Sequence, residues 1–179
     1  YYFDHLGVLS LAITNLAAWM GIAVTPFQVL QANDFSSASL IYTGALLGAI
    51  LLLLALLSDR LNRKKHFSFT YQNFGAHIIF IACIAAMCEF EGTYFAWFLV
   101  LLAVGAYVFR QAFRERSFYF VLITILYAYT GFSIVVLRLL FNAGDMGAVY
   151  AGLLYFIVSA IGVIVVLMKL NKKIKHARV

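Results

Sequence analysis

The chain has 179 residues, of which 65% are hydrophobic and 11% are charged, and it carries a formal net charge of +6. A soluble domain carries about 25% charged residues, and a core of this size cannot hide so large an apolar surplus. The composition excludes an ordinary soluble domain and predicts an all-α, polytopic transmembrane bundle of about six spans.

The first two predicted spans cover about residues 6–24 and 38–57. About 20 apolar residues in a helix cross the hydrocarbon layer, which is ~30 Å thick. Asn15 is the deepest polar residue of the first span, and such a side chain joins helices through hydrogen bonds worth about 1 kcal/mol. In the second span, Gly44 and Gly48 form a small-residue seam. We expect the seam to serve packing within the chain, with dimerisation as the alternative.

The third and fourth predicted spans are short, at about 75–90 and 94–110. The third carries side chains of the types that bind soft metals, namely His77, Cys83, Met87 and Cys88. Cys83 and Met87 share a helical face, but Cys88 points elsewhere and His77 lies well over a turn away. We therefore expect ordinary packing and no metal site. The two cysteines predict no disulfide framework.

The fifth predicted span, at about 118–141, carries a line of polar or small residues. Spacings of 3, 4 and 7 place them along one helical face: Thr124, Tyr127, Gly131 and Arg138. Two hypotheses follow. Either the face is a polar track for an anionic solute, or Arg138 extends to the membrane surface and pairs with an acidic residue, namely Asp145, Glu89 or Glu91. We favour the second.

The sixth predicted span covers about 148–168 and contains Gly152, followed by a basic tail at 169–179. With six spans, twelve of the thirteen basic residues fall on one side of the membrane, in two loops and this tail. Positive residues in short loops mark the cytoplasmic face. We therefore expect a bacterial inner-membrane protein with both ends of this chain in the cytoplasm. Basic charge that flanks spans does not predict nucleic-acid binding.

Spans one and two resemble spans five and six. Residues 13–21 read ITNLAAWMG and residues 123–131 read ITILYAYTG, while Tyr42-Thr43-Gly44 matches Tyr150-Ala151-Gly152. Two explanations stay open. The hairpins are parallel repeats, which in transporters enclose a site between them, or short apolar segments match by chance.

No catalytic motif accompanies the spans. The sequence contains no HExxH, no GxSxG and no phosphate-binding Gly-Lys-Ser/Thr loop. An intramembrane hydrolase needs a nucleophile and a base at membrane depth, and no such pair is apparent. We expect neither an enzyme nor a cofactor.

Four stretches carry a resemblance to a known family: YYFDHLGVLSLAITNLAAWMGIAVTPFQV (1–29), HFSFTYQNFGAHIIF (66–80), SFYFVLITILYAYTGFSIVVLRLLF (117–141) and GLLYFIVSAIGVIVVLMKLNKK (152–173). They resemble the bacterial membrane-protein family catalogued as domain of unknown function 2157. The resemblance implies a multi-span inner-membrane protein, often with additional N-terminal sequence. It supplies no catalytic or ligand-binding residues.

Residues 1–179 are therefore expected to form one transmembrane domain, and the absence of an initiator Met at Tyr1 predicts further sequence upstream. The leading hypothesis is a non-enzymatic membrane module, that is, a scaffold, an assembly partner or a sensor. The alternative is a transporter of small solutes or lipids that uses the polar face of the fifth span. The expected partners are the lipid bilayer, other membrane proteins or a second copy of the chain.

Overall fold

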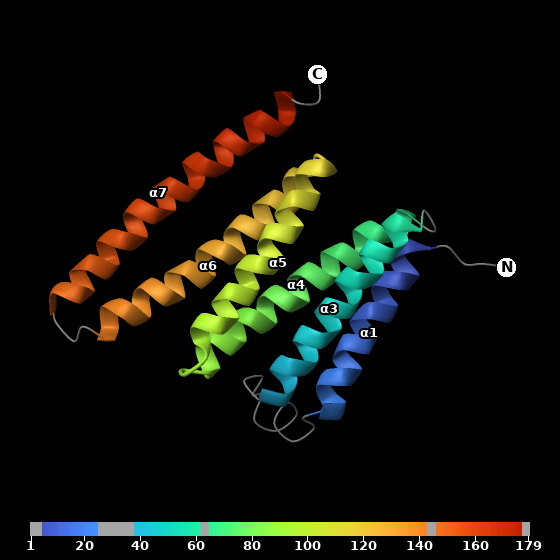
Figure 1. Ribbon diagram of the computed structural model, residues 1–179, viewed down its shortest axis with the longest axis horizontal. Helices are drawn as coiled ribbons and strands as arrows, with labels where there is room; N and C mark the ends of the chain where they lie inside the picture. Colours follow the sequence, from blue (N-terminus) through green and yellow to red (C-terminus); the bar gives the residue numbers. More distant parts are fainter. Residues whose placement is uncertain (1–4, 25–37, 62–64, 143–145, 177–179) are drawn as a thin grey trace. The chain divides into compact units, whose positions relative to one another are not determined.

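The computed structural model describes residues 5–24, 38–61, 65–142 and 146–176, and within these ranges the chain is all-helical (Figure 1). Six helices follow one another: α1 (Leu6–Val24), α3 (Ala38–Arg60), α4 (Lys65–Glu89), α5 (Tyr94–Arg114), α6 (Phe118–Asn142) and α7 (Met146–His176). Each predicted span lies on one of these helices, apart from residue 90 at the end of the third. The prediction of a helical membrane bundle is therefore confirmed.

Five of the described helices, α3 to α7, are long and apolar enough to cross a membrane. The apolar part of α1, Leu6–Gly21, is shorter. The largest difference from the prediction is in α4, which begins at Lys65 instead of near residue 75. Its first turns carry Ser68, Thr70 and Gln72. These residues lower the local hydropathy without preventing a helix, because helical hydrogen bonds form within the backbone.

The chain divides into two compact units, the first ending at Tyr94 and the second beginning at Phe95. In the first unit, α3 and α4 run antiparallel in close contact. A Cβ atom added to Gly48 would lie 2.7 Å from the backbone nitrogen of Ile79. One added to Gly75 would lie 3.0 Å from the backbone nitrogen of Leu52. The two backbones approach this closely because neither glycine carries a side chain.

Helix α1 completes the first unit. Its Ile13 forms a buried apolar cluster with Leu47 and Leu51 of α3, and α4 adds Tyr71, Phe74 and Ile78 around it. The side chain of Leu40 also reaches α1, where it lies 3.6 Å from the position of a Cβ atom added to Gly21. The described part of the first unit thus packs three helices together, and α3 and α4 supply the closest contact.

In the second unit, a tight turn joins α5 to α6. Arg116 adopts a left-handed backbone conformation with φ of 52°. The Arg116 N–H donates to the Phe113 carbonyl at 3.2 Å, and the Ser117 N–H donates to the Ala112 carbonyl at 2.9 Å. This bond pattern satisfies carbonyls that the end of a helix leaves unpaired. It fixes where α5 ends and α6 begins.

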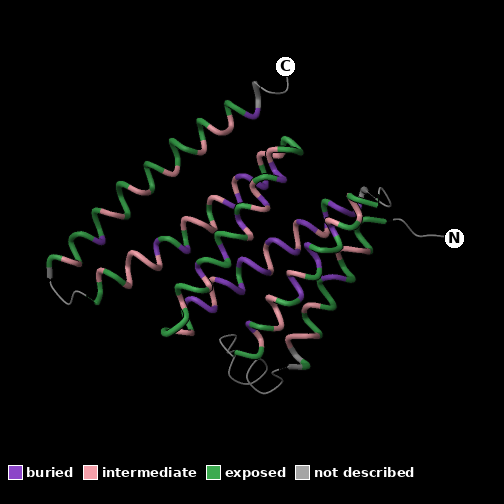
Figure 2. The backbone as a smooth tube through the Cα atoms, viewed as in Figure 1, coloured by how far each residue is buried: buried purple, intermediate pink, exposed green. Residues whose placement is uncertain are grey.

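Helix α7 is the most exposed helix of the second unit, as Figure 2 shows along its length. Among its described side chains, only Gly152 and Ile174 are buried. Leu154, Ile157 and Val158 each expose more than 60% of their surface. An apolar helix with this exposure is suited to contact with lipid chains, which are as apolar as leucine.

Candidate functional site

The predicted polar face of α6 packs against α5. A Cβ atom added to Gly131 would lie 3.3 Å from the Leu101 side chain and 3.5 Å from Phe98. The methyl group of Thr124 lies 3.5 Å from the corresponding position at Gly105. Thr124 is buried, and its hydroxyl donates to the Phe120 carbonyl of its own helix at 2.8 Å. These two members of the predicted track meet apolar side chains and small residues of α5.

The rest of the predicted track is less enclosed. Tyr127 and Arg138 are half-buried. Asp145, one of the acidic residues suggested as partners of Arg138, lies outside the described residues. An apolar pocket of about 270 Å³ adjoins Thr124 between α5 and α6, and it is lined by Gly105, Ala106 and Ala128 among others. The only side-chain hydroxyl among its lining residues is that of Thr124, which its own helix already satisfies.

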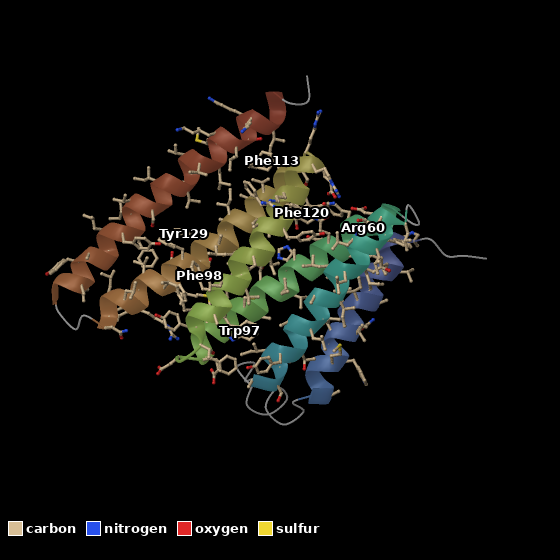
Figure 3. The ribbon with its side chains drawn as sticks, viewed as in Figure 1. Arg60, Trp97, Phe98, Phe113, Phe120 and Tyr129 are labelled. Carbon is tan, nitrogen blue, oxygen red and sulfur yellow. The ribbon has the colours of Figure 1, made fainter. Side chains whose placement is uncertain are left out.

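Two hydrogen bonds join α6 to α7, on the face of α6 opposite Thr124. Tyr129 Oη and Ser159 Oγ are 3.0 Å apart, and Ser133 Oγ and Tyr155 Oη are also 3.0 Å apart. Tyr129 projects from α6 towards α7 (Figure 3). Ser159 also donates to the Phe156 carbonyl at 3.3 Å, which leaves its oxygen to accept from Tyr129. We call these four residues the tyrosine–serine ladder.

The ladder is reciprocal, because each helix contributes one tyrosine and, four residues later, one serine. Residues four apart lie on one side of a helix, so antiparallel helices place the tyrosine of each opposite the serine of the other. Sequence reasoning missed these residues. The repeated spacing Tyr-x-x-x-Ser, at Tyr129–Ser133 and Tyr155–Ser159, is the signal that identifies them.

The residues predicted to pack helices occupy different surroundings. Gly48 meets the backbone of α4, as described above, and Gly44 faces Ala82 of α4 at 3.7 Å. Gly152 faces Leu140 and Leu137 of α6 at 3.8 and 3.9 Å. Asn15, in contrast, is exposed on α1.

The two resembling hairpins are therefore packed differently. Gly44 contacts the helix that follows its hairpin, whereas the matching Gly152 contacts its hairpin partner. Gly21 contacts its hairpin partner α3, whereas the matching Gly131 contacts α5, which precedes its hairpin. The sequence match between the hairpins is thus not accompanied by matching glycine contacts.

The first unit contains an apolar pocket of about 350 Å³ between α1, α3 and α4. Its lining includes small residues from all three helices, among them Ala17, Gly44 and Ala85. The only side-chain hydroxyl among its lining residues belongs to Thr43, and it donates to the Ser39 carbonyl at 2.7 Å. A cavity without free polar partners does not hold ordered water.

Comparison with known proteins gives no relative from which an activity can be transferred. No family model matches the chain. No curated protein and no solved structure matches it either. Any functional conclusion therefore depends on the geometry of the helices.

Proposed function

We propose that this chain is a non-enzymatic assembly module of the bacterial inner membrane, which binds other membrane proteins through its exposed helix faces. The observation that carries the proposal is the use of polar groups in α6. Thr124 bonds to its own backbone, while Tyr129 and Ser133 bond to α7. Hydroxyls used in this way stabilise helix packing and leave little to coordinate a solute.

The apolar pockets support the same proposal. A transporter of polar solutes needs convergent polar groups at membrane depth, since an unsatisfied polar group in hydrocarbon costs several kcal/mol. The pocket beside Thr124 offers apolar and small residues instead. The exposed apolar surface of α7 is a large face on which another membrane helix can pack.

The orientation belongs to the same proposal. Basic residues lie at the ends of three helices: Arg60 in α3, Arg114 in α5 and several lysines in α7. If successive spans alternate in direction, these three ends lie on the same side of the membrane. Positive residues favour the cytoplasm, so we place both ends of this chain there. We further propose that the chain belongs to the bacterial membrane-protein family of domain of unknown function 2157, whose members are expected in the inner membrane.

Cysteine accessibility in native membranes tests the proposal. In a variant with Cys83 and Cys88 replaced, single cysteines are introduced at Thr124, Tyr127 and Val135 on the α5-facing side of α6. Two exposed turn positions, Gly92 and Arg116, serve as references for the two sides of the membrane. A membrane-impermeant thiol reagent is applied from each side in turn.

We expect each reference position to be labelled from one side only, and we expect the three positions on α6 to stay unlabelled. Arg116 should react from the cytoplasm and Gly92 from the outside. Labelling of Thr124 and Tyr127 at rates close to those of the references would show a water-filled route along α6. That result would replace the assembly module with a transporter.

A further inference from the structure

Helix α1 has two unlike faces. Its inner face packs on α3 and α4 through Ile13, which exposes only 4% of its surface. The opposite face carries Leu11 and Trp19, which expose 65% and 66% of their surfaces. Asn15 lies between them on this outer face and is also exposed. The outer face is therefore apolar except for one carboxamide.

Asn15 lies in the middle of α1, as the tenth of its 19 residues. The neighbouring hydroxyls are satisfied within the helix, because Ser10 donates to the Leu6 carbonyl and Thr14 donates to the Ser10 carbonyl. A carboxamide has two N–H donors and an acceptor oxygen, which a helix backbone does not fully satisfy. Within the described part of the chain, no hydrogen bond reaches the Asn15 side chain.

The lipid bilayer offers no hydrogen-bond partner to the Asn15 side chain. Lipid chains at mid-membrane offer no hydrogen-bonding group, and the Asn15 side chain is too short to reach the headgroups about 15 Å away, half the hydrocarbon thickness. A polar partner at the same depth is needed. Lateral contact with another membrane helix supplies one.

We propose that the outer face of α1 is a self-association surface, on which Asn15 hydrogen bonds with Asn15 of a second copy. This inference deepens the proposed assembly function and rests on it. Two copies inserted in the same direction have parallel α1 helices, so their Asn15 residues lie at the same depth. The carboxamide is self-complementary, which fits the two-fold symmetry of most dimers.

The flanking residues allow close approach. Ala12 and Ala18 share the outer face with Asn15 and are exposed. Residues three apart in a helix lie on the same side of it. Small residues let two membrane helices come close enough for short side chains to form hydrogen bonds. A polar asparagine within an otherwise apolar seam also fixes the register of a helix pair.

The test is energy transfer between two differently labelled populations of the full chain, reconstituted in phosphatidylethanolamine–phosphatidylglycerol vesicles at several protein-to-lipid ratios. Asn15→Leu should weaken association roughly tenfold, which corresponds to about 1.4 kcal/mol. Asn15→Gln keeps a carboxamide and should restore most of the association. Thr14→Val is the matched control and should leave association unchanged, because the Thr14 hydroxyl bonds within its own helix.

A second measurement locates the contact. In the variant without native cysteines, a cysteine at Leu11 on the outer face should form a disulfide between copies, whereas one at Ile13 on the inner face should not. A wild-type chain that stays monomeric at all ratios would overturn the proposal. An Asn15→Leu variant that keeps its helicity and associates as strongly as wild type would also overturn it. Disulfide formation by the cysteine at Ile13 but not by the one at Leu11 would do the same. Thiol labelling of the single cysteines on α6, measured in the same vesicles, tests the proposed assembly function separately.

Discussion

In the α3–α4 pair the two backbones touch, whereas in the α6–α7 pair side-chain hydroxyls bridge the helices. Gly48 leaves no room for a Cβ atom beside Ile79. At Gly152, by comparison, a Cβ atom would meet only the ends of leucine side chains at ordinary contact distances. The first pair is held by close packing of backbones, and the second by the tyrosine–serine ladder.

The difference shows how helices associate where water does not drive them together. Lipid and protein side chains are equally apolar, so burial of apolar surface contributes little inside a membrane. Dispersion between close backbones is one remaining source of stability, and hydrogen bonds between side chains are another. The α3–α4 pair has the close backbone contact and also a bond from Ser68 Oγ to the Ala55 carbonyl at 3.4 Å, while the α6–α7 pair has the two bonds of the ladder. Both sources of stability can therefore be measured in the same chain.

The largest effect is expected for Gly48→Ala, which tests the backbone contact. The new methyl group would lie 2.7 Å from the Ile79 nitrogen, so α3 and α4 must move apart. Overpacking of this kind costs about 1–3 kcal/mol, and we expect a value near the upper end because the obstacle is backbone. The measurement is equilibrium unfolding in bicelles with increasing dodecyl sulfate, followed by circular dichroism.

Gly44→Ala is the matched control for that variant. It lies one turn away on the same seam, but its added methyl would meet Ala82 at 3.7 Å, an ordinary contact. We expect a change within about 0.5 kcal/mol. Equal effects of the two variants would mean that the close backbone contact at Gly48 does not control stability.

Gln72→Met should stabilise the protein, and it tests whether polar groups buried in the first unit are all satisfied. Gln72 is 2% exposed, and its Nε2 group has no hydrogen-bond partner among the described residues. An unsatisfied buried donor costs about 1–3 kcal/mol, which an unbranched apolar side chain of similar length would avoid. We expect a gain of about 1 kcal/mol in the same unfolding assay. A loss of stability would show that the amide holds a partner that the variant removes.

A double-mutant cycle on Tyr129→Phe and Ser159→Ala tests the ladder. Each single variant removes one side of a hydrogen bond between helices. Coupling energies of such bonds in a membrane protein average about 0.6 kcal/mol and reach about 1.7. We expect a similar coupling here, and an equal one for Ser133→Ala with Tyr155→Phe. Additive effects in both cycles would show that shape alone holds α6 to α7.

The helices themselves could be predicted from the sequence because hydrophobic length is a strong signal. Runs of about 20 apolar residues have few alternatives in a membrane. The start of α4 could not be predicted, since Ser68 and Gln72 are compatible with a helix but not with a hydropathy threshold. The signal for a span and the signal for a helix differ where a helix extends beyond the hydrocarbon.

The faces of α6 were harder to predict. Thr124 and Gly131 do share a face, as their spacing indicates, but that face meets α5. Two bonds to α7 lie on the other face, at Tyr129 and Ser133. In a soluble helix the apolar face identifies the core. In a membrane both faces are apolar, so the neighbour of each face depends on tertiary packing that one sequence does not encode locally.

The smallest effect is expected for Thr124→Val. This variant compares a hydroxyl that bonds within its own helix with a hydroxyl that bonds to a second helix. The Thr124 hydroxyl donates to the Phe120 carbonyl, which the helix backbone also satisfies, so its removal leaves no group unpaired. The valine keeps the methyl contact with Gly105. We expect a change within about 0.5 kcal/mol, below that of Ser133→Ala on the opposite face. If Thr124→Val is the more destabilising of the two, the α5-facing side and not the ladder contains the important polar group of α6.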